Sequence, residues 1–385
     1  MTHAADSAAA LVVGGGISGM SAAAACGQWA EGSPVVVLDR GRRIGGRMAA
    51  RTLRDGPWAG HVVDLGAAYF TVSHPDFATV VDDWRDRGLV RSWTDTFAVA
   101  GPDGVTGHST GPMRYASPTG LRSLVEDLAT QAEVQVRHPV EATTVTAVEG
   151  GWRVNHIVTG DGSGAAPGRV ADRAPLLALC LPAPQAIELL ATPVPTAMLS
   201  AARDPRVEEL ESLWQAATAI AYEPILALVA QWPERTWDDF AGCFVNDDDV
   251  LSFVADDGDR RGDGAAVLVA HSTPEFAARH LLDPAGATTE MVQSLCRILR
   301  LSPPSAAQVK RWAVARPAAT SPQARDAALA SAGSDSPVDD GGFLLGASGT
   351  VGLASDAFDA RPRVEAAWLS GRALGMALGS AAYTA

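Results

Sequence analysis

A pattern of strand, glycine turn, helix and strand near the N-terminus constrains the fold of this chain more than any other feature. It consists, in order, of the apolar run Leu11–Val13, the glycines Gly14, Gly16 and Gly19, the alanine-rich segment Met20–Ala30, the β-branched run Val35–Leu38 and Asp39. The glycines stand at G-x-G-x-x-G spacing, and the acid follows the last glycine by about 20 residues. This arrangement is typical of a βαβ unit that binds a dinucleotide.

Each signature position in this unit has a physical role to play. Gly14 permits the tight turn, Gly16 lets the backbone approach a pyrophosphate, and Gly19 lets the helix sit close to the strand. The helix N-terminus presents unbonded N–H groups and a partial positive charge to phosphates. Asp39 is placed to accept a hydrogen bond from a ribose hydroxyl. The sequence therefore predicts a dinucleotide site at this turn.

A second glycine-rich stretch, Arg42–Arg47, follows directly after the second predicted strand. Gly45 and Gly46 allow backbone amides to face the cofactor, and Arg47 can pair with a phosphate as a fork. The alternative interpretation is a surface loop with three arginines, but the position of the stretch favours binding. A G-G-R at this place resembles FAD-binding proteins of the amine-oxidase type more than nicotinamide dehydrogenases.

Length, charge and cysteine spacing narrow the class of protein. A chain of 385 residues predicts two closely joined domains, and a net charge of −14 argues against nucleic acid or an anionic membrane as a partner. The four cysteines are far apart and form no C-x-x-C, so we expect neither a disulfide framework nor a metal site, and a cytoplasmic setting. The uncharged stretch Ser7–Ala30 lacks a basic flank and is interrupted by glycines, which predicts neither a signal peptide nor a membrane span.

The rest of the chain predicts a return to the first domain after two excursions. Helices are expected at Pro75–Arg87, Leu121–Gln131, Pro274–Leu282, Thr288–Leu301 and Val364–Ala382. Strands are expected at Val134–Arg137, Val140–Val148, Trp152–Ile157, Pro175–Leu181, Ala219–Ala230, Cys243–Val245, Leu251–Val254, Ala265–His271, Val309–Val314, Phe343–Leu345 and Thr350–Ala354. Polar loops are expected at Asp256–Asp263 and Ser331–Gly342, and a frayed tail through about Ala8.

Three aromatic or imidazole side chains can be interpreted in two ways from the sequence alone. Tyr69, after the predicted strand that begins near His61, either emerges near the cofactor or belongs to a core aromatic pair with Phe70. His271, at the end of a strand, is either structural or part of a site. Trp312, next to Arg311, is either a core aromatic or the wall of a pocket.

Nearly the whole chain resembles bacterial renalase-like flavoproteins, within the wider amine-oxidase-type FAD superfamily. The resemblance rests on Gly14–Gly19, Asp39 with Gly45–Met48, Asp64–Thr71, Leu181–Gln185, Gly242–Val245, His271, Arg311–Trp312 with Ala315–Pro317, and Arg363–Glu365 with Ala367–Gly371. The first motif is common to the superfamily, whereas the stretches around Tyr69, Trp312 and Arg363 are more specific.

The resemblance implies an α/β fold of two domains, similar to hydroxybenzoate hydroxylase. A Rossmann-type FAD domain would comprise 9–75, 112–205 and 340–385, and a substrate domain with a mixed or antiparallel sheet would comprise 76–111 and 206–339. FAD would be bound non-covalently by Gly14, Gly16, Ser18, Gly19, Asp39, Arg40, Gly46, Arg47, Asp356, Arg363 and Val364. Tyr69, His271 and Trp312 would be the catalytic residues and would wall the substrate pocket.

The activity implied by the resemblance is an oxidase reaction. Dihydronicotinamide isomers with hydrogen at the wrong ring carbon would give hydride to the flavin, and O₂ would accept the electrons and form hydrogen peroxide. The protein would act as a monomer or homodimer on a small-molecule substrate. The alternatives are an FAD-dependent oxidase or dehydrogenase of amines or another small hydrophobic substrate, and a flavin-bound sensor without turnover.

Two departures from the family pattern bear on these expectations. Ser355 stands where a glycine usually precedes Asp356, and the acidic run Asp256–Asp259 replaces a basic, asparagine-containing stretch. The second departure affects the choice of substrate more than the binding of flavin.

Overall fold

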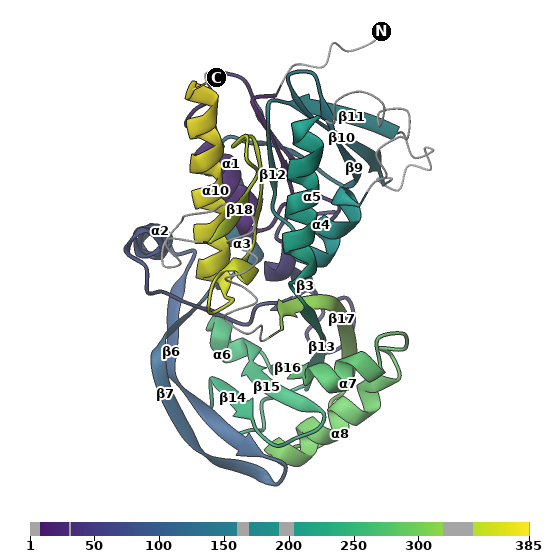
Figure 1. Cartoon of the computed structure of the whole chain (residues 1–385). Helices are drawn as coiled ribbons and strands as arrows, with labels where there is room; N and C mark the ends of the chain where they lie inside the picture. The colour runs from purple at the N-terminus through teal and green to yellow at the C-terminus, as the bar shows by residue number, and fades with distance from the viewer. Residues whose placement is uncertain (1–7, 31, 160–168, 192–203, 319–341, 385) are drawn as a thin grey trace. The chain divides into compact units, whose positions relative to one another are not determined.

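The computed structural model describes residues 8–30, 32–159, 169–191, 204–318 and 342–384 (Figure 1). The N-terminal tail before Ala8 and most of the loop predicted at Ser331–Gly342 lie outside these residues. The chain divides into two units. The first unit comprises Met1–Gly46, Val125–Ala221 and Pro317–Ala385, and the second comprises Arg47–Leu124 and Tyr222–Arg316.

The first unit contains a six-stranded sheet built on the N-terminal strand. Its order is β18 (Phe343–Leu345), β19 (Val351–Ala354), β12 (Leu176–Leu179), β1 (Ala10–Val13), β2 (Val35–Leu38) and β8 (Gln135–Arg137). The last five strands are all parallel to one another, and β18 at the edge is antiparallel to β19. Every residue of β1, β2, β12 and β19 is buried, as expected of parallel strands covered on both faces. β2 and β8 lie on one side of β1, whereas β12, β19 and β18, which come later in the chain, lie on its other side. The strand order therefore reverses between β1 and β12. Open α/β sheets bind ligands at such a point.

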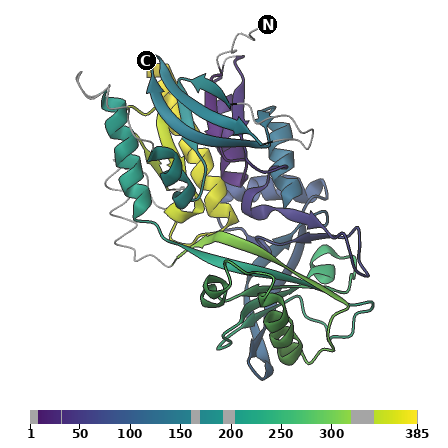
Figure 2. The same cartoon turned by 90° about the vertical axis from the view of Figure 1, so that its right-hand side faces the viewer.

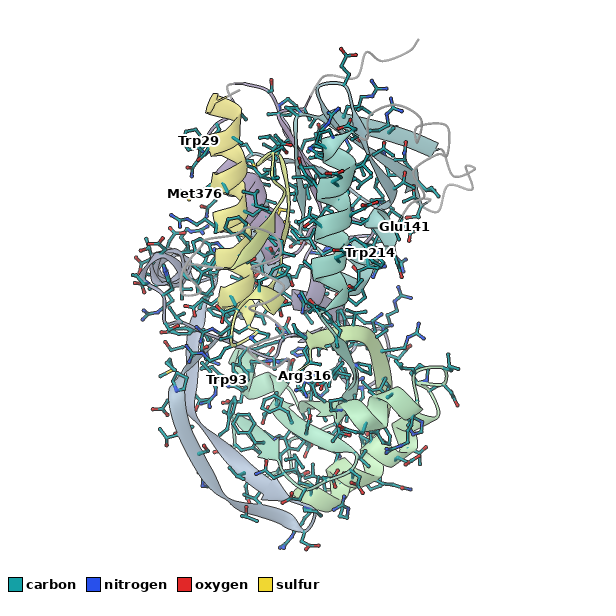
Figure 3. All side chains as sticks on the ribbon, viewed as in Figure 1. Trp29, Trp93, Glu141, Trp214, Arg316 and Met376 are labelled. Carbon is teal, nitrogen blue, oxygen red and sulfur yellow. The ribbon has the colours of Figure 1, made fainter. Side chains whose placement is uncertain are left out.

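Helices α1 (Ile17–Gly27) and α10 (Val364–Thr384) pack against each other in the first unit (Figure 1). Three glycines of α10, four residues apart, make the contact. A Cβ on Gly371 would lie 2.0 Å from the Ser18 carbonyl oxygen, and one on Gly375 would lie 2.5 Å from that of Ala22. A Cβ on Gly379 would lie 2.2 Å from the ring of Trp29. Trp29 is labelled beside α10 in Figure 3. The two helix backbones therefore touch.

The remainder of the first unit is a small antiparallel sheet and two helices. The sheet has the order β11 (Arg169–Ala174), β10 (Gly151–Val158) and β9 (Val140–Val148) and appears in blue and teal in Figure 2. Helices α4 (Ala183–Leu190) and α5 (Pro205–Thr218) pack together. Helix α5 was not predicted, because its residues read as the beginning of a strand-rich region.

The second unit contains an eight-stranded sheet. Its order is β17 (Ala306–Pro317), β13 (Tyr222–Gln231), β16 (Val267–Ser272), β15 (Leu251–Asp256), β14 (Gly242–Val245), β6 (Arg91–Gly101), β7 (Gly104–Ala116) and β5 (Phe70–Thr71). β14 and β6 are parallel, whereas β13–β16, β16–β15, β15–β14, β6–β7 and β7–β5 are antiparallel. This mixed sheet confirms the predicted architecture of the second half.

Smaller elements complete the two units. They are the hairpin of β3 (Ala50–Thr52) and β4 (Val62–Asp64), the short 3₁₀ helices η1 (Gly46–Met48) and η4 (Asp356–Phe358), and the helices α2 (Pro75–Asp86), α3 (Arg122–Gln131), α6 (Asp257–Arg261), α7 (Pro274–Arg279) and α8 (Ala287–Leu299). None of the described helices is both long and apolar enough to cross a bilayer.

Two expectations differ from the structure. Helix α1 begins at Ile17, three residues before the predicted Met20, because Gly16 already serves as its N-cap. The segment from Asp256 to Asp263 is not an open polar loop, since it contains helix α6, capped by the Asp256 side chain and buried at four of its five residues. The two compact units change at 46/47, 124/125, 221/222 and 316/317, and the domain boundaries expected from the sequence stay a prediction.

Candidate functional site

The glycine turn after β1 contains two glycines that the fold itself requires. Gly14 has a φ of +111°, and a Cβ there would lie 2.3 Å from the Cys180 carbonyl oxygen. A Cβ on Gly19 would lie 1.8 Å from the Gly14 carbonyl oxygen. Both positions are thus closed to any side chain by the backbone of the first unit.

Gly16 is different, because the protein does not need a glycine there. Its φ of −86° is open to any residue, and the atom nearest to an added Cβ would be the Gly46 Cα at 3.9 Å. Gly16 is also the N-cap of α1, whose first turn has no acidic residue and no side-chain cap. The first N–H groups of a helix have no acceptor within the helix. At the start of α1, these N–H groups therefore lie next to a residue without a side chain. That combination fits a phosphate group.

Hydrogen bonds hold Asp39 and the loop that follows it against this turn. The Asp39 carboxylate accepts hydrogen bonds from the backbone N–H of Gly15 at 2.7 Å and of Gly41 at 2.8 Å. An ionised carboxylate can accept about four hydrogen bonds, so it retains capacity for a ligand hydroxyl. The Gly45 N–H donates to the Gly15 carbonyl at 2.8 Å, and Gly46 has a φ of +52°. Arg40 is exposed on the same loop.

Asp356 lies at the same edge of the first unit's sheet as the glycine turn, because β19 and β1 both run parallel to β12. It is buried and follows β19 through Ser355. Ser355 has an extended backbone, with a φ of −167°, so no glycine is needed at this position. Its Oγ accepts from the Ala357 N–H at 3.1 Å and donates to Asp356 Oδ1 at 3.0 Å. The local backbone and hydrogen bonds therefore accommodate a serine at position 355.

The start of α10 carries the remaining predicted residues of the first unit. Val364 is the first residue of the helix. Arg363 pairs at 2.5 Å with Glu365, whose side chain is completely buried in the first turn. Ser18, also predicted to bind the cofactor, is buried in the first turn of α1.

Arg47 belongs to the second unit, although it follows the glycine loop directly. Its Nη1 donates to the Ala315 carbonyl at 3.4 Å, and its guanidinium lies 5.8 Å from the Tyr222 ring centre. Its own carbonyl accepts from the Ala67 N–H at 2.9 Å.

An aromatic cluster occupies the second unit around Tyr69. The Tyr69 ring centre lies 5.3 Å from Phe97, 6.0 Å from Phe253 and 6.2 Å from Trp93. Phe244 joins at 5.3 Å from Phe97. Tyr69, Trp93 and Phe244 are half-buried, while Phe97 is fully buried. We refer to Tyr69, Trp93, Phe97, Phe244 and Phe253 as the aromatic cluster.

His271 adjoins this cluster through Phe253. The two residues are cross-strand partners on β16 and β15, with ring centres 6.1 Å apart. Its Nε2 is buried and has no hydrogen-bond partner. Burial, with the positive charges of Arg260 and Arg316, lowers the pKa of His271 to about 4. The imidazole is therefore neutral at physiological pH.

Trp312 contacts the segment that leads to Tyr69 rather than the cluster itself. Its Nε1 donates to the Leu65 carbonyl at 2.7 Å, and it packs beside a core of Leu53, Val63, Leu65 and neighbouring strand residues. The structure therefore brings Tyr69 and His271 together through Phe253 and places Trp312 against residues just before Tyr69.

A buried ion-pair network beneath Tyr69 was missed by the sequence interpretation. Asp257 on α6 pairs with Arg260 and Arg261, and Arg261 reaches Asp64 at 3.0 Å. His61 Nε2 lies 2.9 Å from Asp257 Oδ2. Burial would raise the pKa of Asp257, but its cationic neighbours hold that pKa below its usual range.

This network also fixes the backbone in front of Tyr69. Arg260 Nη1 donates to the Ala68 carbonyl at 2.9 Å, and its Nη2 lies 3.4 Å from the Asp64 carbonyl. Together with the Trp312 bond to Leu65, these contacts hold the segment 64–68 at three carbonyl groups. The sequence contained no local sign of this, since the partners are almost 200 residues apart.

Arg114 on β7 was likewise not predicted. Its guanidinium lies 3.9 Å from the Phe97 ring centre, 5.7 Å from Tyr69 and 5.9 Å from Phe244. Among the residues that the structure describes, no group of three or more His, Cys, Asp or Glu side chains could hold a metal ion.

Comparisons with known proteins agree with this architecture. A model of the NAD(P)-binding Rossmann-like domain matches residues 12–84. A putative protoporphyrinogen oxidase from Exiguobacterium sp. 255-15 superimposes with a TM-score of 0.66 at 13% identity, covering 96% of this chain and 98% of that one. A cofactor-binding redesign of putrescine oxidase, a triple mutant, superimposes with a TM-score of 0.65 at 14% identity, covering 98% of both chains.

The chain therefore has the mixed α/β fold of these oxidases, with a Rossmann-like dinucleotide-binding domain and an additional sheet domain.

Proposed function

We propose that the first unit binds FAD non-covalently and that the chain is a flavin-dependent oxidoreductase. The observation that carries this proposal is Gly16, a glycine with no structural need to be one, at the uncapped start of α1. Asp39, Gly46 and Asp356 supply an acceptor, bare backbone and a buried carboxylate in the same unit, as a dinucleotide requires. The fold shared with oxidases across nearly the full length supports flavin over a nicotinamide cofactor.

For the reaction, we propose the renalase type. When bound, FAD supplies a hydride acceptor and can pass the electrons to O₂ to give hydrogen peroxide. A dihydronicotinamide isomer donates hydride without needing a base, so the protein has to stack the ring and exclude water. The aromatic cluster and neutral His271 suit that task, because aromatic faces pack against a planar ring. Tyr69, His271 and Trp312 are the residues that the family resemblance assigns to this pocket.

The alternative of an amine substrate is less well supported by the charges in the second unit. Putrescine oxidase, one of the solved structures with this fold, is named for a diamine. In this chain the cation of Arg114 lies among the aromatic rings, and a second cation would be repelled there. This arrangement favours a neutral or anionic substrate.

The test is an anaerobic reduction screen on the purified protein. We expect a yellow protein whose flavin absorbance is bleached by 2- or 6-dihydronicotinamide isomers but not by putrescine or benzylamine. Readmission of air should restore the colour and release hydrogen peroxide. A protein that stays colourless after incubation with FAD would refute flavin binding. Bleaching by amines alone would support the amine-oxidase alternative, and bleaching by dithionite alone would support a flavin-bound sensor.

A further inference from the structure

Arg114 is a buried cation whose surroundings leave its charge unsatisfied. The residue is 5% exposed, and its Nη1 is buried without a hydrogen-bond partner. Within the described part of the chain, no carboxylate lies within ion-pair distance of it, and its neighbours are the faces of Phe97, Tyr69 and Phe244. A guanidinium is always charged in proteins, and cation–π attraction to aromatic faces offsets only a part of the free-energy cost of burying it.

Two other cations close to this region, Arg260 and Arg316, each have a carboxylate partner. Arg260 pairs with Asp257 and donates to the Ala68 carbonyl. Arg316 pairs with Glu223 at 2.8 Å. The acid that touches the aromatic cluster, Asp259, accepts a hydrogen bond from Trp93 Nε1 at 2.7 Å. Arg260 also has a buried Nε without an acceptor, but its charge is compensated by Asp257. Among the described residues, Arg114 therefore differs from Arg260 and Arg316 in having no carboxylate partner for its charge.

We propose that Arg114 is the specificity-determining cation of the aromatic cluster and binds an acceptor oxygen, anionic or carbonyl, on an aromatic or dihydroaromatic ring. The ring would lie against the half-buried Tyr69 and Phe244, and the oxygen would accept from the guanidinium. A carboxylate makes the strongest such bond, and a carboxamide oxygen makes a weaker one. A ring that carries an ammonium group is rejected by like charge. This inference narrows the substrate class of the proposed function, but ligand binding by Arg114 does not itself require flavin.

Isothermal titration calorimetry with three ring probes tests this directly. Benzoate, benzamide and benzylamine share a planar ring and differ in the charge and acceptor of one substituent. We expect the wild-type protein, with and without added FAD, to bind benzoate most tightly, benzamide more weakly and benzylamine not measurably. Arg114→Met should weaken benzoate by about tenfold or more, as expected for the loss of a charge-assisted hydrogen bond, and Arg114→Lys should retain part of the affinity.

Arg51→Met is the matched control, because Arg51 is an exposed arginine of the same unit on β3. It should leave benzoate binding unchanged. Circular dichroism establishes that each variant is folded, and the lysine variant provides the comparison if the methionine variant is not. Equal affinity for benzoate in the wild-type and Arg114 variants, or tighter binding of benzylamine than of benzoate, overturns the inference.

The two proposals fail separately. Benzoate binding that depends on Arg114, in a protein that no dihydronicotinamide reduces, supports this inference and refutes the proposed reaction. If dihydronicotinamide isomers bleach the flavin but the protein does not bind benzoate, the result supports the proposed reaction and refutes ligand binding by Arg114.

Discussion

At the scale of single residues, the glycines of the first turn have separable reasons to be glycine. An added Cβ would lie 2.3 Å from a backbone oxygen at Gly14 and 1.8 Å from one at Gly19. At Gly16 it would make only an ordinary van der Waals contact, with the Gly46 Cα at 3.9 Å. The spacing of the three glycines was enough to predict the turn and the βαβ unit, because the backbone conformation of a turn depends on residues that are adjacent in sequence. It could not predict Arg114 or the His271 environment, since their neighbours come from strands that are distant in sequence. Ligand contacts of Gly16 and Asp39 stay predictions.

Replacing Gly16 and Gly19 by alanine should separate binding from folding. Gly16→Ala adds a methyl where the protein has room, so the melting temperature without FAD should stay within about 1–2 °C, reflecting only a few tenths of a kcal/mol. FAD affinity, measured by flavin fluorescence quenching, should fall by about tenfold or more, because the methyl occupies the approach to the pyrophosphate.

Gly19→Ala is the contrasting variant, because its methyl would overlap the Gly14 carbonyl. It should lower the melting temperature of the FAD-free protein, typically by the equivalent of about 1–3 kcal/mol. Unaltered FAD binding by Gly16→Ala would count against the phosphate assignment at this turn.

The neutral His271 should make stability depend on pH in a defined window. Its pKa is about 4 in the folded protein against an ordinary value of 6.5, so the unfolded chain binds more protons between these values. The contribution is fully present above pH 6.5 and is lost as the pH falls toward 4. Denaturant unfolding of wild type and His271→Gln from pH 4 to 8 checks this: the variant should lack that part of the slope. Parallel pH profiles for the two proteins would contradict the buried neutral imidazole.

At the scale of secondary-structure elements, strongly patterned segments were predictable and α6 was not. The strands β1, β2 and β12 and the helix α10 are continuous apolar runs or glycine stripes, and they lie where predicted. Helix α6 has the composition of a surface loop, Asp257–Arg261. Its partners lie far away in the sequence: Asp64 pairs with Arg261, and His61 Nε2 lies 2.9 Å from Asp257 Oδ2. Such long-range pairing leaves no local periodicity to detect.

Neutralising Asp257 should destabilise the second unit strongly. Asp257→Asn leaves Arg260 and Arg261 buried without their shared carboxylate, which typically costs about 3–5 kcal/mol. Asp83→Asn is the control, because its ion pair with Arg87 at 2.7 Å is exposed on α2 and such pairs contribute about 0–1 kcal/mol. Urea unfolding should show a large shift for the first variant and a small one for the second. Equal shifts would mean that the buried network is not a net support of the fold.

At the scale of the whole molecule, the chain passes between the two units four times. A discontinuous two-domain organisation was predictable from the return of parallel-type strands near the C-terminus. The residues at which the chain passes from one unit to the other were not predictable, because the sequence near the glycine loop, α3 and α5 shows no change of pattern there. Assignment of FAD binding to the first unit and of substrate binding to the second stays a proposal.

Contiguous halves of the chain should therefore fail to fold. Residues 1–221 lack β18, β19 and α10 of the first unit, and they lack most of the second unit's sheet. We expect 1–221 and 222–385, expressed separately, to be insoluble or to unfold without a cooperative transition by circular dichroism, whereas the full chain melts cooperatively. A sharp thermal transition in either half would show that its sheet is self-sufficient.

The contact between α10 and α1 also determines where the start of α1 lies. Because bare backbone meets bare backbone along Gly371 and Gly375, the depth and tilt of α1 are set by a helix more than 300 residues later in the sequence. The position of the amides at the start of α1 therefore depends on α10. Under the proposed binding of FAD, a nascent or shortened chain that lacks α10 should not bind the nucleotide.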